Sequence, residues 1–182
     1  MTLRWMTDSD QLVKQAQTGD ELAFEQLLQQ CYDQMFRFAI KWSGNRTNAE
    51  DITHQSCIKL AKSLKSYRFE CAFSSWLYRL VINSAIDWQR SQQRHLHDEL
   101  DTDTQACELA ADSAAESELY LRQVMKLIAE FGEGYRETVA LVFGEGLSHR
   151  EAAEVLAVKE STVSWRIHDI RKRLAPLTAG GD

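Results

Sequence analysis

An acidic segment at residues 96–118 sets the strongest limit on what this chain can fold into. It carries eight acidic side chains, no basic one and almost no large apolar residue. Such a composition cannot bury enough apolar surface to fold alone. We therefore predict a flexible acidic linker between two small domains, residues 1–95 and residues 119–182. The whole chain has 182 residues, which is enough for two modest cores.

The apolar pattern on both sides of the linker is helical. From Asp20 to Ser43 apolar side chains recur at steps of three and four residues, which predicts one long amphipathic helix. Asn48 is expected to cap the next helix, with Glu50 and Asp51 in its first turn. The chain has one proline and no strand-like alternation, so both domains are predicted to be all-α. The helices expected in the first domain are residues 10–17, 20–43, 48–64 and a fourth after a loop at 66–72.

The end of the chain predicts a helix-turn-helix. Ser148 with Glu151 three residues on forms a capping box, and a turn at residues 157–159 leads to a second helix. Five basic residues against two acidic ones lie between Lys159 and Leu174, which favours attraction to phosphates. If the turn needs a positive φ, Ala157 costs about 1 kcal/mol. The side chains expected to face inward are Val163, Ile167, Ile170 and Leu174, and those expected to be exposed are Ser164, Trp165 and His168.

Taken together, stretches from both halves resemble the extracytoplasmic-function group of the sigma-70 family over essentially the whole chain. They are DQLVKQAQTGDELAFEQLLQQCYDQMFRFA, NAEDI and FSSWLYRLVINSAIDWQR in the first half, and YRETVALVFGEGLSHREAAEVLAVKESTVSWRI in the second. The resemblance implies a first domain that binds the polymerase clamp and the −10 element, and a second that binds the −35 element and the flap. It also implies core RNA polymerase, promoter DNA and an anti-sigma protein as partners.

For the polymerase clamp, the resemblance points to one helix of the first domain. The residues that it assigns are Glu50, Asp51, His54 and Gln55. His54 and Gln55 stand where relatives usually carry a Gln-Glu pair, and Cys57 and Ala61 stand at two usual aromatic positions. We expect these departures to alter the affinity for the clamp or the packing of this helix.

For the −10 element, the resemblance assigns Tyr67, Arg68, Arg79, Asn83 and Trp88. Tyr67 matches the residue that stacks on an unpaired base, a contact that offsets the cost of taking the base out of the duplex. Asn83 matches a polar residue of the same pocket, and Arg68 and Arg79 could hold the DNA backbone. Trp76 has a core spacing and is expected to be structural.

For the −35 element, the matching face lies on the last helix. Its residues are Thr162, Ser164, Trp165, Arg166, His168, Asp169, Arg171 and Arg173. Arg166 could reach guanine, and Asp169 could accept a hydrogen bond from cytosine. Relatives more often have a small residue at Trp165 and a basic one at Asp169, so the promoter preference should differ from the common pattern.

Two other classes of function remain as alternatives. A helix-turn-helix regulator that binds duplex DNA by itself explains the second domain equally well, but such regulators usually dimerise. An enzyme is disfavoured because the sequence has no Gly-rich phosphate loop and no H-E-x-x-H or G-x-S-x-G motif. The four cysteines, Cys31, Cys57, Cys71 and Cys107, lack the spacing of a metal site or disulfide framework, so we expect no metal or cofactor. No apolar run is long enough to cross a membrane, and a cytoplasmic location is expected.

Overall fold

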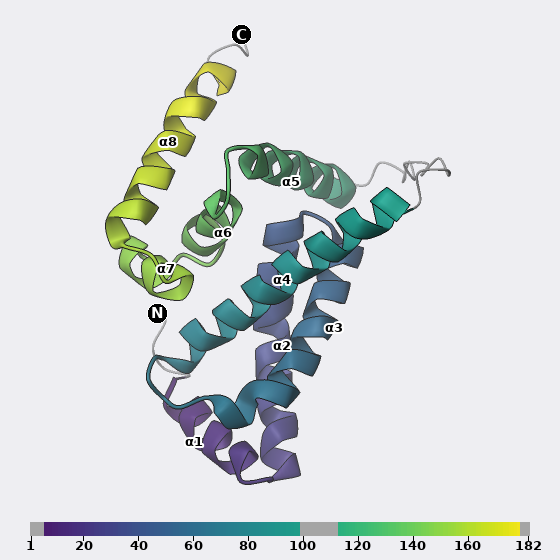
Figure 1. Cartoon of the computed structure of the whole chain (residues 1–182), viewed down its shortest axis with the longest axis vertical. Helices are drawn as coiled ribbons and strands as arrows, with labels where there is room; N and C mark the ends of the chain where they lie inside the picture. The colour runs from purple at the N-terminus through teal and green to yellow at the C-terminus, as the bar shows by residue number, and fades with distance from the viewer. Residues whose placement is uncertain (1–5, 99–112, 179–182) are drawn as a thin grey trace.

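The computed structural model of the chain describes residues 6–98 and 113–178, and within these ranges it is built of helices without any strand (Figure 1). In the first domain α4 crosses over α2 and α3, and α1 packs at the far end of the bundle. The elements of this domain are α1 (Met6–Gln17), α2 (Glu21–Ser43), α3 (Arg46–Ser63), the 3₁₀ turn η1 (Leu64–Ser66) and α4 (Phe73–Asp98). Those of the second domain are α5 (Ser113–Glu130), α6 (Tyr135–Val139), the π turn η2 (Ala140–Gly144), α7 (His149–Leu156) and α8 (Glu160–Thr178).

Helix α2 is the central element of the first domain, and it forms where its sequence pattern predicts. The Asp20 side chain accepts a hydrogen bond from the amide of Ala23, which caps the first turn. Gly44 ends the helix in the left-handed conformation, with φ of 63°, and its amide donates to the carbonyl of Ile40. The stripe of α2 that is buried in the core comprises Ala23, Leu27, Cys31, Met35, Phe38, Ala39 and Trp42.

Other helix ends differ from the prediction. Asn45, not Asn48, caps α3, because the Asn45 side chain accepts a hydrogen bond of 2.9 Å from the amide of Asn48. As a result, Glu50 and Asp51 lie beyond the first turn of α3, where the helix dipole acts on them less. Helix α4 continues to residue 98 and α5 begins at residue 113, so both helices enter the segment predicted as linker. The rest of that segment, residues 99–112, lies outside the described residues.

The predicted helix-turn-helix is present as α7 and α8. Ser148 and Glu151 form the capping box, with each side chain bonded to the backbone of the other residue. Ala157 ends α7 with a positive φ of 53°, the conformation foreseen as a cost for a residue with a β-carbon. Three predicted inward side chains are buried and the fourth is partly buried; they are Val163, Ile167, Ile170 and Leu174.

Replacing Ala157 with glycine is expected to stabilise the protein by about 1 kcal/mol, because glycine adopts a positive φ without steric cost. Urea unfolding followed by circular dichroism would measure the change. Ala61→Gly is the matched control, since Ala61 is exposed within α3, and it should destabilise by about 1 kcal/mol. If Ala157→Gly also destabilises, strain at this turn is not the dominant effect.

The capping box gives a second prediction, on pH dependence. Hydrogen bonds from the Ser148 side chain and backbone lower the pKa of Glu151 below its ordinary value of 4.5. The stability from this interaction is therefore complete above pH 4.5 and is lost as the pH falls through the lower folded-state pKa. Ser148→Ala should destabilise by about 1 kcal/mol at neutral pH. Thermal unfolding should show this difference narrowing below pH 4; a constant difference would contradict the role of the ionised carboxylate.

The two domains pack against each other across a buried polar contact. The indole nitrogen of Trp42 donates a hydrogen bond of 3.1 Å to Oε1 of Glu137, and Glu137 is only 8% exposed. The guanidinium of Arg136 lies 4.5 Å from the centre of the Trp42 ring. A buried carboxylate needs such partners to offset its desolvation. Trp42, on α2, thus links the first domain to α6 of the second.

A second carboxylate, that of Glu145, joins the domains near η2. Its Oε1 lies 2.8 Å from Nζ of Lys41, and its Oε2 accepts a hydrogen bond of 2.8 Å from the hydroxyl of Tyr78. Burial, and then the charge of Glu145, raise the pKa of Tyr78, so this hydroxyl remains a donor. The apolar core of the first domain continues into Ala152 and Val155 of α7. We call this packing of the two domains the closed arrangement.

Candidate nucleic-acid interface

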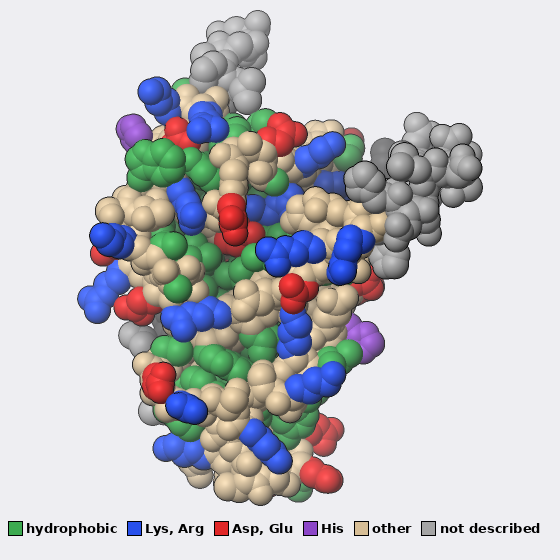
Figure 2. Space-filling model, viewed as in Figure 1, with side chains coloured by type: hydrophobic (Ala, Val, Ile, Leu, Met, Phe, Trp, Pro, Cys, Tyr) green, Lys and Arg blue, Asp and Glu red, His purple; other side chains and the backbone are tan. Residues whose placement is uncertain are grey.

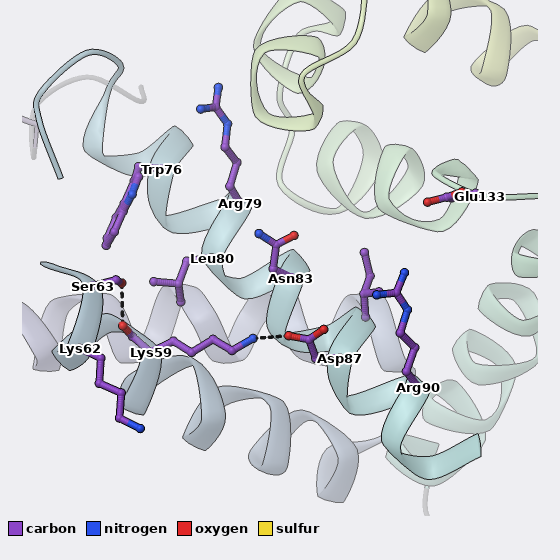
Figure 3. Close-up of a pocket in the computed structure, with 11 residues that line it drawn as sticks. Lys59, Lys62, Ser63, Trp76, Arg79, Leu80, Asn83, Asp87, Arg90 and Glu133 are labelled. Carbon is purple, nitrogen blue, oxygen red and sulfur yellow. Dashed lines mark hydrogen bonds and ion pairs between the residues drawn. The ribbon is translucent and has the colours of Figure 1, made fainter. Parts of the chain in front are cut away.

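A groove of about 810 Å³ lies between α3 and α4 and reaches the turn before α6 (Figure 3). Four basic and two acidic side chains line it, and Lys59 forms an ion pair of 2.6 Å with Asp87. The side chains that line the groove are Lys59, Lys62, Ser63, Trp76, Arg79, Leu80, Asn83, Ile86, Asp87, Arg90 and Glu133. Basic side chains also stand along α4 in the space-filling view (Figure 2). A basic groove with an aromatic wall suits a single nucleic-acid strand.

The groove brings together two of the residues predicted for the −10 element, Arg79 and Asn83. They lie one turn apart on α4, and Asn83 is exposed. Lys59 and Lys62 on α3 and Arg90 on α4 complete the basic lining, and our sequence reasoning did not single them out. The spacing in the sequence could have indicated them, because residues 79, 83 and 90 share one face of a helix and residues 59 and 62 share one face of another.

Next to the groove, Tyr67 lies in a cluster of aromatic rings. Its ring centre is 5.3 Å from that of Trp76 and 4.7 Å from that of Phe69. The side chain is 6% exposed, and its hydroxyl donates a hydrogen bond of 2.6 Å to the carbonyl of Cys71. In this arrangement the Tyr67 ring is packed, so contact with a base requires the ring to turn out of the cluster. Phe69, at 37% exposed, is the more accessible ring of the cluster.

The remaining residues predicted for the −10 element lie apart from the groove lining. Arg68 is exposed at the start of the loop. Trp88 is half-buried and packs against the core of the first domain. Trp76, expected to be structural, also packs against this core, but it lines the groove as well. The roles of these residues in binding DNA remain predictions.

Arg79 is engaged by the second domain in the closed arrangement. Its Nε donates a hydrogen bond of 3.1 Å to the carbonyl of Val155, and an Nη donates to the carbonyl of Glu154. Both carbonyls belong to the C-terminal turn of α7, and that of Glu154 also accepts a long hydrogen bond of 3.4 Å from the amide of Ala157. Figure 3 shows the Arg79 side chain extending away from the groove floor. The same arginine is therefore a helix cap and a candidate DNA ligand.

The exposed face of α8 carries much of the predicted −35 surface. Trp165 is 57% exposed, and His168, Arg171 and Arg173 are also exposed. Thr162 is half-buried. Ser164 was expected to be exposed but is half-buried, because its hydroxyl lies 2.9 Å from Nδ1 of His149 on α7.

Two of the predicted base-reading side chains turn back into the domain. Arg166 donates to the hydroxyl of Thr138 at 3.3 Å and packs over the backbone of Gly134. The Asp169 carboxylate accepts a hydrogen bond of 2.7 Å from the hydroxyl of Tyr135, which lowers the pKa of Asp169. Arg173 lies 2.8 Å from the same carboxylate. Either side chain has to leave these partners before it can reach a base.

Helix α3 presents the residues predicted for the polymerase clamp. Glu50, Asp51, His54 and Gln55 are all exposed on its outer side. Glu50 forms an ion pair of 3.1 Å with Arg46. Ile58, one turn after His54 and 46% exposed, extends this face with an apolar side chain that our sequence reasoning did not single out. An apolar side chain with polar ones around it is the arrangement of a protein-binding surface, which has an apolar centre and a polar rim.

The part of the chain that the structure describes shows neither a metal-ligand cluster nor a membrane-spanning helix. Among the described residues, no three His, Cys, Asp or Glu side chains come together as metal ligands. Cys107 lies outside the described residues. None of the described helices has the length and apolar character needed to cross a bilayer.

Comparisons with known proteins match both domains of the chain. Residues 27–95 match the family model for sigma-70 region 2, and residues 121–174 match that for sigma-70 region 4. The chain is 32% identical over 162 residues to the ECF RNA polymerase sigma factor SigM of Mycobacterium tuberculosis, covering 87% of this chain and 79% of that protein. It is 29% identical over 181 residues to the ECF RNA polymerase sigma factor SigE of Mycolicibacterium smegmatis, covering 93% of this chain and 69% of that protein.

Solved structures match the fold of almost the whole chain. CnrH, in complex with the cytosolic domain of CnrY, matches with a TM-score of 0.68 and 23% identity, over 94% of this chain and 97% of that one. The sigma factor RpoE of Bartonella quintana, in complex with the anti-sigma factor NepR, matches with a TM-score of 0.64 and 21% identity, over 87% of this chain and 98% of that one.

Proposed function

Because the chain belongs to the extracytoplasmic-function group of the sigma-70 family of promoter-recognising RNA polymerase sigma factors, we propose specific surfaces for each of its tasks. The groove between α3 and α4, with the loop at residues 67–72, binds the −10 element. The exposed face of α8 binds the −35 element, and the outer face of α3 binds the polymerase clamp. The observation that carries this proposal is the basic groove, in which Asn83 and Trp76 lie beside the lysines of α3.

The domain division follows from the same function. We propose that residues 1–95 act at the clamp and the −10 element, residues 119–182 act at the −35 element, and residues 96–118 connect them. The acidic connection can occupy a basic channel of the polymerase and leave it when a transcript arrives.

The closed arrangement has to open on the promoter. The names −10 and −35 give the positions of the two elements, which are therefore about 25 base pairs apart. This is about 85 Å of duplex at about 3.4 Å per base pair. A compact chain of 182 residues has a radius of gyration of about 16 Å. It therefore cannot reach both elements while the domains are packed together. We propose that polymerase binding separates them and releases Arg79 from α7.

Partners and location follow as further proposals. The chain binds core RNA polymerase and promoter DNA, and the CnrH and RpoE complexes support an anti-sigma protein as a partner of this chain as well. It carries out no reaction of its own, since in this family catalysis belongs to the polymerase. It acts in the cytoplasm, where the bacterial chromosome is transcribed.

Run-off transcription from a genomic promoter library tests the function. Core polymerase would be used with and without this protein, and the start sites would be mapped. New start sites that share two spaced elements are expected. Binding to duplex DNA without any redirection of the polymerase would instead support a stand-alone helix-turn-helix regulator.

A further inference from the structure

One face of α1 lies against the loop at residues 67–72, although α1 precedes the part of the chain matched as sigma-70 region 2, residues 27–95. Three side chains of α1, at positions 10, 14 and 17, are spaced four and three residues apart and so share this face. Each of them acts on the loop or on the turn before it.

Gln17 makes the most direct contact. Its side-chain amide nitrogen donates one hydrogen bond of 2.9 Å to the carbonyl of Leu64 and another of 2.8 Å to the carbonyl of Tyr67. Leu64 begins the turn η1, and Tyr67 is the first residue after it. A single side chain therefore ties the end of the α3 segment and the start of the loop to α1.

The other two residues support the same contact. The ammonium group of Lys14 lies 5.2 Å from the ring centre of Phe69, inside the loop. Asp10 lies close enough for its charge to add to burial in raising the pKa of Tyr67 to about 12. Phe69 has a positive φ of 58°, which is unfavourable for a bulky residue and persists only where its surroundings hold it.

We propose that Gln17 is a positioning residue for promoter opening: it fixes the loop at residues 67–72 in place to capture a base of the −10 element. The inference rests on the proposed role of this loop. A loop that is already ordered loses less conformational entropy when it binds, so more of the binding energy remains for unpairing the DNA. Without the two hydrogen bonds of Gln17, the polymerase would have to order the loop at the same time as it opens the duplex.

Gln17→Met tests the proposal, because methionine has a similar size and shape but no amide donor. The matched control is Gln15→Met, since Gln15 is exposed on another side of α1. Holoenzyme would be assembled on a promoter recovered from the library, either as intact duplex or with its −10 region already unpaired by mismatches. We expect Gln17→Met to lower transcription from the duplex about tenfold, the usual net worth of one to two hydrogen bonds, and to affect the unpaired template much less.

A measurement without DNA separates this inference from the proposed function. Hydrogen exchange of the free protein should be faster at residues 68–72 in Gln17→Met and unchanged in Gln15→Met, with similar melting temperatures. If the wild-type holoenzyme gives no transcript but hydrogen exchange at residues 68–72 is faster in Gln17→Met, the proposed function is wrong, while the anchoring of the loop by Gln17 is confirmed. If Gln17→Met behaves like Gln15→Met in exchange and in the ratio of duplex to unpaired transcription, Gln17 does not position the loop.

Discussion

Replacing Gly44 with alanine is expected to open the closed arrangement and to raise promoter-specific transcription when the protein is limiting. A β-carbon at Gly44 would come within 2.4 Å of Cα and 2.6 Å of the amide nitrogen of Arg122 on α5. Backbone atoms cannot yield as a flexible side chain can, so α5 has to move away from the end of α2. The open form is not penalised by this clash, and the equilibrium shifts towards it.

Gly146→Ala is the control for backbone strain. Gly146 has φ of 70°, close to the 63° of Gly44, but a β-carbon there would meet nothing within 4 Å. Both variants therefore place alanine in the left-handed conformation, and only Gly44→Ala also introduces the clash. Overpacking costs about 1–3 kcal/mol, which corresponds to a change of about fivefold to over a hundredfold in the ratio of open to closed protein.

Small-angle scattering measures the separation of the domains, and run-off transcription measures its effect on activity. The radius of gyration of the free protein should increase in Gly44→Ala and not in Gly146→Ala. Transcription at limiting protein should rise in the same variant, since the apparent affinity depends on the fraction of protein that is competent to bind. Equal scattering from the two variants would mean that the contact of α2 with α5 does not hold the domains closed.

The helices were predictable because the signals that define them are local. The N-cap at Asp20 and the capping box of Ser148 and Glu151 depend on residues three positions apart. The inward side chains of α8 repeat at helical spacing, and the prediction is confirmed by the burial of Val163, Ile167 and Ile170 and the partial burial of Leu174. The error at Asn48 arose because two asparagines lie close together where α3 begins and either could cap a helix; the structure uses the first, Asn45, and Asn48 lies inside α3.

The packing between domains was not predictable in this way. Trp42 fits the apolar stripe of α2, and nothing in its neighbourhood indicates that its indole nitrogen bonds to Glu137, 95 residues away. The same limit applies to Arg79, whose position on α4 matches a DNA ligand while its side chain caps α7. These contacts depend on the arrangement of two folded domains, which the periodicity of either one does not specify.

Asp169 makes one contact within its own helix and one with a distant helix, and only the first follows from the sequence. Arg173 lies four residues further along α8, so their ion pair follows from helical spacing. The hydrogen bond from Tyr135 joins α6 to α8 and has no such signal. Sequence reasoning therefore identified the helical spacing of these residues, and missed which of them are already held by intramolecular partners.

Neutralising two basic residues of the groove is expected to have the largest effect on binding to the unpaired −10 strand. Lys62 and Arg90 are both exposed and line the groove from α3 and α4, while Lys59 is already paired with Asp87. If each contacts one phosphate, Lys62→Gln with Arg90→Gln removes two contacts. The slope of log K against log salt should then become less steep by about 1.4, which weakens binding about 25-fold at 0.1 M salt relative to 1 M.

A control with the same change of charge distinguishes direct contacts in the groove from a general electrostatic attraction between the protein and DNA. Lys126→Gln with Arg150→Gln removes two exposed basic groups from α5 and α7, outside the groove. Fluorescence anisotropy would follow holoenzyme binding to a promoter fragment with an unpaired −10 strand over a range of salt concentrations. The control should keep the wild-type slope, because charges further apart than about 10 Å are screened at 0.1 M salt. Equal slopes in the two double variants would show that the DNA strand does not lie in the groove between α3 and α4.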